Sequence, residues 1–113
     1  MFRFVPNPTF TVPVPLSVPG MPEQLEHVHV TFRHQDKTPL DRWLAGWDAR
    51  PDAAVLGEVI VDWKGVTDEQ GDEVPYKLTN LAALCERYPI ASKELLDAYL
   101  GELTASKKKT SRK

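Results

Sequence analysis

Two kinds of hydrophobic periodicity divide this chain. Apolar and polar residues alternate strictly over residues 9–18, and a second alternation runs over residues 25–34. A period of two is typical of a β-strand with one buried face. The stretch of residues 19–22 between the two runs predicts an antiparallel hairpin whose loop is longer than two residues.

Two prolines place the first strand within its sheet. Pro13 and Pro15 lack the N–H that a ladder requires, and because they are two apart, both missing donors lie on the same side. This arrangement predicts an edge strand with its proline side facing solvent, which also discourages edge-to-edge aggregation.

Beyond residue 37 the period becomes helical. Four stretches carry apolar residues at i, i+3, i+4 and i+7, the spacing that places four side chains on one helix face. They are Leu40, Trp43, Leu44 and Trp47; Leu56, Val59, Ile60 and Trp63; Leu81, Leu84, Cys85 and Tyr88; and Leu96, Tyr99, Leu100 and Leu103.

Start and stop signals frame these four helices. Thr38 followed by Pro39 is typical of an N-cap with proline at the first helical position. Gly65 accepts the left-handed conformation of a residue that follows a helix, so the second helix is expected to end there. Pro89 is expected to end the third.

The predicted fold class is α+β, an N-terminal antiparallel β-hairpin packed against a bundle of about four short α-helices. Helices this short are marginal in water alone, so they must bury their apolar faces together. We expect one domain over residues 1–103 and a disordered basic tail over residues 104–113. The predicted core combines the even-numbered face of the first strand with Leu56, Ile60, Trp63, Leu81, Leu84, Tyr88, Leu96 and Leu103.

Charge separates the tail from the rest of the chain. The net charge is −2 over 113 residues, but five of the 14 basic residues lie beyond Glu102, the last acidic residue. The remainder carries nine basic and 16 acidic side chains, a net charge of about −7 that makes it a poor nucleic-acid binder. No run approaches the ~18 apolar residues of a membrane span, and no secretory h-region opens the chain, so we expect a cytoplasmic protein.

The histidines offer an incomplete metal site. His27 and His29 lie two apart on a strand, which places their imidazoles on one face roughly 7 Å apart. Two ligands do not make a site, and His34 has the opposite parity. A metal-dependent enzyme built on this pair stays open as a remote alternative.

The acidic run and the single cysteine do not indicate a metal site or a catalytic site. The acidic run around Gly71 cannot be an EF-hand loop, because glycine at the sixth position would make Val66 the first ligand. Cys85, the only cysteine, lies on an apolar helical stripe and is expected to pack in the core. We predict no catalytic residue, no metal and no cofactor.

The aromatic residues are the best candidates for a binding surface. Three Trp are hard to bury completely in so small a body, and an exposed Trp or Tyr patch is typical of a protein-binding hot spot. The predicted partner-binding residues are Trp43, Trp47, Tyr76 and Tyr88. Trp43 and Trp47 are expected to be the most exposed.

Several motifs in fixed order carry a resemblance to a known family. They are Val61-Asp62-Trp63-Lys64-Gly65-Val66, Asp68-Glu69-x-Gly71, Val74-Pro75-Tyr76, Asn80-Leu81, Tyr88-Pro89, and Ala98-Tyr99 with Leu103. With two strands and a Trp-containing helix before them, they resemble the tail assembly chaperones of long-tailed bacteriophages and prophages over residues 10–103. The prolines of the first strand and the basic tail depart from the family pattern.

The resemblance implies a function. Such a chaperone keeps the long, aggregation-prone tape measure protein soluble in the bacterial host until tail-tube subunits polymerise around it. It implies no enzymatic activity, and it leaves room for the tail-tube protein as a second partner and for a homo-oligomer. The alternative from another class is a small nucleic-acid-associated regulator anchored by the basic tail.

The resemblance also suggests a role for the tail. Genes of this family are often read in two ways, and Lys107, Lys108 and Lys109 are the residues that a slippery run of adenines would encode. We expect a longer frameshifted product that shares most of this chain, unless the basic end only aids solubility.

Overall fold

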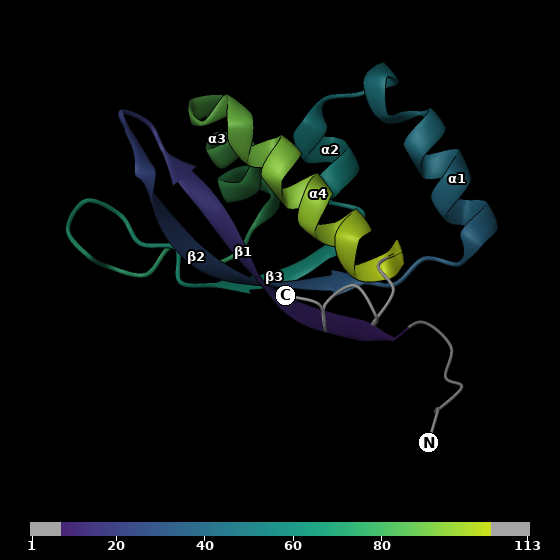
Figure 1. Ribbon diagram of the computed structural model, residues 1–113, viewed down its shortest axis with the longest axis horizontal. Coiled ribbons are helices and arrows are strands. Elements are labelled where there is room, and N and C mark those ends of the chain that lie inside the picture. The colour runs from purple at the N-terminus through teal and green to yellow at the C-terminus, as the bar shows by residue number, and fades with distance from the viewer. Residues whose placement is uncertain (1–7, 105–113) are drawn as a thin grey trace.

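The computed structural model describes residues 8–104, which form a three-stranded antiparallel sheet covered on one face by helices (Figure 1). The strands are β1 (Thr9–Val18), β2 (Met21–Arg33) and β3 (Ile60–Lys64), in the spatial order β1-β2-β3. The expected α+β class is confirmed. The basic tail at residues 105–113 lies outside the described residues.

The β1–β2 hairpin follows the alternation in the sequence, but its turn is shorter than predicted. Only Pro19 and Gly20 separate the strands, and Gly20 takes a φ of 82° that glycine adopts without strain. A register irregularity between Ser17 and Val18 lets Val18 pair with Met21. The prediction of a longer loop was therefore wrong, because the irregularity absorbs the extra residues.

The edge position of β1 is confirmed. Pro13 and Pro15 pair with His29 and His27 across the hairpin, and none of the described strands lies on the other side of β1. The Ser17 N–H also points away from β2, because it donates to the Glu94 carboxylate on helix α4 at 3.1 Å. Prolines and this contact together protect the outer edge from pairing with another chain.

The predicted second helix is the main error. Helix α2 spans only Asp52–Leu56, and the chain then enters β3, which pairs with β2 from Phe32↔Ile60 to His29↔Lys64. A bulge leaves Val61 unmatched, so Ile60 and Trp63 both face the core. An i, i+3 burial pattern that suggests a helix therefore comes from a bulged strand.

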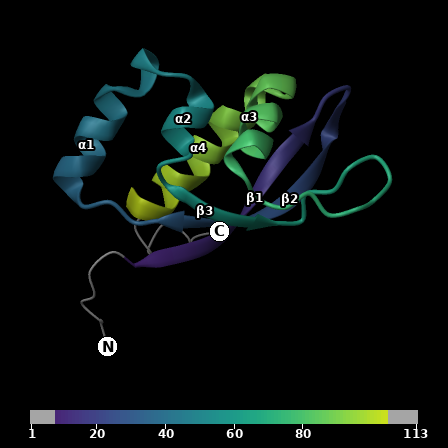
Figure 2. The ribbon, with the colours of Figure 1, turned by 180° about the vertical axis from the view of Figure 1, so that it is seen from behind.

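The helices form the second layer, all on one face of the sheet (Figures 1 and 2). They are α1 (Lys37–Ala45), the short 3₁₀ helix η1 (Trp47–Ala49), α2, α3 (Leu78–Arg87) and α4 (Pro89–Thr104). Helix α1 begins one residue before the predicted cap: Asp36 occupies the N-cap position and makes no side-chain capping bond. The third and fourth helices are confirmed.

One hydrophobic core joins the two layers. Helix α4 lies against β1, and its Tyr99 ring stacks on Phe10 and contacts Phe32, with centroids 6.0 and 5.0 Å apart. The Tyr99 hydroxyl donates to the Arg33 carbonyl at 2.8 Å, so this buried ring leaves no polar group unpaired.

The predicted core list needs corrections within the helices. Leu56, Ile60, Trp63 and Leu81 are buried as expected. Helix α4 turns Leu95 rather than Leu96 into the core, so Leu96 and Leu103 are only partly buried, as is Leu84 on α3. Tyr88 is 42% exposed.

Candidate partner-binding pocket

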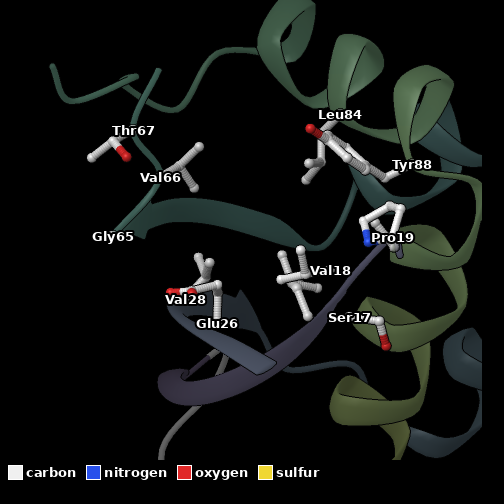
Figure 3. A pocket seen from close by; sticks show the side chains of 12 residues that line it. Ser17, Val18, Pro19, Glu26, Val28, Gly65, Val66, Thr67, Leu84 and Tyr88 are labelled. Atoms are coloured by element: carbon white, nitrogen blue, oxygen red, sulfur yellow. The ribbon is translucent and has the colours of Figure 1, made fainter. Parts of the chain in front are cut away.

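An open pocket of about 300 Å³ lies between the distal half of the β1–β2 hairpin and helix α3 (Figure 3). It exists because β2 extends well beyond β3: pairing between these two strands stops at His29, while the hairpin continues to Met21. The lining residues are Leu16, Ser17, Val18, Pro19, Glu26, Val28, Gly65, Val66, Thr67, Leu84, Tyr88 and Ala91.

The floor and the far wall of the pocket are apolar. Figure 3 shows Val18 and Val28 pointing from the hairpin toward the side that holds Leu84 of α3 and Tyr88, the residue that follows this helix. Pro19, in the hairpin turn, also lines the pocket. An apolar lining that stays open to solvent favours binding of an apolar group from another molecule.

The opposite wall is the start of the acidic connector. Gly65 has a φ of 97°, which turns the chain away from β2, and Val66 and Thr67 then line the pocket. The Thr67↔Glu73 bridge closes a small loop. Gly65 was predicted to end a helix, but it ends strand β3.

The acidic loop is held by its own side chain. Asp68 Oδ1 accepts hydrogen bonds from the N–H groups of Gln70 and Asp72, at 2.9 and 3.0 Å. Four acidic residues and no basic residue lie between Gly65 and Tyr76, so this wall carries negative charge. Within residues 8–104, no group of three or more His, Cys, Asp or Glu could hold a metal ion.

The four predicted partner-binding residues do not lie together. Trp43 is only 7% exposed and donates from its indole Nε1 to the Val55 carbonyl at 3.2 Å, so the expectation that it is exposed was wrong. Trp47 is partly buried with its ring edge-on to Trp43, at a centroid distance of 5.6 Å. Of the four, only Tyr88 lines the pocket.

Tyr76 belongs to a separate contact. Its ring lies edge-on to Trp63, with centroids 5.2 Å apart, and Trp63 Nε1 donates to the Val74 carbonyl at 2.8 Å. The buried Tyr76 hydroxyl has no hydrogen-bond partner among the described residues. Desolvation by burial raises the pKa of this phenol, so Tyr76 is neutral over the physiological range.

Sequence reasoning missed most of the lining. Val18, Val28 and Val66 appear in the sequence only as members of alternating or connector segments. The sequence could have indicated the pocket only through the difference in length between the second alternating run and a short third strand. Because residues 60–64 were predicted to be helical, no third strand was expected and the difference was not visible. Without a third strand, there was no reason to expect an uncovered hairpin end.

Cys85, His27 and His29 do not line the pocket. Burial first, and then the nearby Asp52 charge, raise the pKa of the Cys85 thiol to about 11, so it is protonated and unreactive at neutral pH. His27 and His29 lie exposed on the face of the sheet opposite the helices.

The described residues form a small α+β fold with an open, largely apolar pocket. The chain belongs to the phage tail assembly chaperone family, whose model matches residues 1–110. No curated protein and no solved structure matches it. None of the helices in residues 8–104 is long and apolar enough to cross a membrane.

Proposed function

We propose that this protein binds the tape measure protein and keeps it soluble in the cytoplasm of the bacterial host during tail assembly. Membership of the phage tail assembly chaperone family carries this proposal. The tail-tube protein is the second candidate partner. The role requires binding and release of a client, with no chemical step.

The pocket supports this function physically. The client exposes apolar side chains before it is packed in the tail. Burial of these side chains against Val18, Val28 and Leu84 removes apolar surface from water and therefore favours binding. The excess of acidic side chains in the body favours solubility of the chaperone while this apolar surface stays open.

Co-expression with the tape measure protein of the same phage tests the proposal. The expected result is a larger soluble fraction of the client, measured by sedimentation and immunoblotting. Tyr88→Ala should reduce that fraction, because it removes one wall of the pocket. Ile90→Ala is the matched control, since Ile90 is similarly exposed at 45% but does not line the pocket.

Trp47→Ala tests the other predicted surface. If the client binds at the α1–η1 corner, this variant rather than Tyr88→Ala will lose client solubility while its melting temperature stays close to that of the parent chain. A tape measure protein that is equally soluble without this chain would contradict the proposed function.

A further inference from the structure

The distal half of β2 has an edge that no strand within residues 8–104 covers. Along β2, the Arg33 N–H points toward β3, where it donates to the Val59 carbonyl at 2.7 Å. Because N–H and C=O directions alternate along a strand, Leu25 and His27 point their groups to this same edge. Pairing with β3 stops at His29, and no other described backbone group bonds to the edge at Leu25 or His27.

The two edges of the hairpin are therefore unequal. On β1, Pro13 and Pro15 remove edge donors and the Ser17 N–H is bound by Glu94. On β2, the two positions that face this edge beyond the end of β3 are Leu25 and His27, and neither is a proline. Within residues 8–104, the β2 edge beyond β3 lacks the protection against a further strand that the two prolines and Glu94 give to the β1 edge.

The open edge and the pocket share one site. Val28 and Glu26 line the pocket from the same stretch of β2, which pairs with β1 and extends beyond the end of β3. A Cβ at Gly65 would meet the His27 carbonyl oxygen at 3.4 Å, so β3 stays close up to this glycine and then turns away. The position next to β2 that a longer β3 would occupy is therefore adjacent to the pocket.

We propose that this site binds an extended segment of the client, which adds as a strand to the β2 edge beside Leu25 and inserts alternate apolar side chains into the pocket. Backbone hydrogen bonds supply the alignment, and the apolar floor and Tyr88 supply the side-chain contacts. This inference rests on the proposed function and specifies how the client is held.

Charge selects among extended segments. Glu26 lines the pocket, and the wall that begins at Gly65 continues into Asp68, Glu69, Asp72 and Glu73. A segment with a Lys or Arg next to its apolar residues is favoured over an acidic one, and its binding weakens as salt rises.

Peptides that tile the tape measure protein are the probes. Each should be about 12 residues long, which spans the uncovered part of β2 at ~3.3 Å per residue. Fluorescence polarisation with the full chain should find binding by peptides that combine alternating apolar positions with a basic residue. Tyr88→Ala should weaken this binding about tenfold or more, while Ile90→Ala changes it less than about twofold.

Backbone N-methylation tests strand addition directly. Methylating alternate amides of the best peptide should abolish binding for one set of positions and leave the other set nearly unchanged, because only alternate amides face β2. Equal loss from both sets would overturn the proposal in favour of a helical ligand, because every interior amide of a helix donates a hydrogen bond. No loss from either set would overturn it in favour of binding through side chains alone.

A variant pair tests the same point on the protein. Leu25→Pro removes the edge N–H while the ladder with β1 remains, whereas Leu25→Val keeps the donor. The proline variant alone should lose peptide binding, with both circular dichroism spectra unchanged. If Leu25→Pro fails to fold, the N-methylated peptides decide alone.

Two further outcomes separate the alternatives. If the full chain dimerises and peptide binding falls as the dimer forms at rising chain concentration, a second copy fills the site and the proposal is overturned. If the client stays soluble but its peptides ignore N-methylation, strand addition fails while the proposed chaperone function stands.

Discussion

At the scale of single residues, burial of aromatic side chains decides which can act as anchors. Trp43 is buried in a ring cluster with Trp47 and Tyr99 and donates to the Val55 carbonyl. Trp43→Ala should therefore cost about 3–5 kcal/mol of unfolding free energy, as expected for truncation of a large buried side chain. Urea denaturation followed by fluorescence measures this change. A loss below about 1 kcal/mol would contradict the buried position.

Cys85 makes a prediction about reactivity. Its pKa of about 11, compared with a reference of 9.0, lowers the thiolate fraction at neutral pH about 100-fold. Alkylation by iodoacetamide at neutral pH should slow by at least that factor in the folded chain relative to the urea-unfolded chain. The Cys85 thiol binds its proton more tightly in the folded state than in the unfolded state. The free energy of unfolding that this difference contributes is therefore fully present below pH 9 and is lost as the pH rises through about 11. Cys85→Ala should remove the part of the stability decrease between pH 9 and 11 that comes from this thiol.

At the scale of secondary-structure elements, helix α3 separates a buried face from an exposed one. Leu81 is fully buried, whereas Leu78 is 62% exposed on the same helix. Leu81→Ala should cost about 2–5 kcal/mol, and Leu78→Ala less than about 0.5 kcal/mol. Urea midpoints of the two variants provide the comparison, and equal effects would contradict the orientation of α3.

A second element-scale prediction concerns the contact between α4 and β1. The Glu94 carboxylate accepts both the Ser17 N–H and the Ser17 hydroxyl across 77 positions of sequence. Glu94→Ala should destabilise the fold by about 1–3 kcal/mol, because it leaves a partly buried N–H unpaired. Lys93→Ala is the control, since its ion pair with Asp97 is exposed and contributes little. Thermal unfolding of both variants checks the difference.

At the scale of the whole molecule, the fold is predicted not to depend on a metal. Within residues 8–104 there is no cluster of three potential ligands, and His27 and His29 stand on the uncovered face of the sheet. Adding EDTA should leave the unfolding midpoint unchanged, because an ion bound only to the native state would stabilise it by mass action. A clear fall of the midpoint would restore the histidine pair as a site.

The sequence alone determined the features that depend on local pattern. Alternation with prolines at odd positions was sufficient for the β1–β2 hairpin and its protected edge, and helical spacing was sufficient for α1, α3 and α4. The ordered motifs were sufficient for the family, which the match over residues 1–110 confirms.

Only the tertiary structure decided β3 and, with it, the pocket. A bulged strand and a helix can bury the same i, i+3 pair, so Ile60 and Trp63 did not distinguish them until β2 supplied a hydrogen-bonding neighbour. The pocket follows from the unequal lengths of β2 and β3 and from the position of α3, whose Leu84 lines it. These relations involve residues distant in sequence, which local periodicity does not encode.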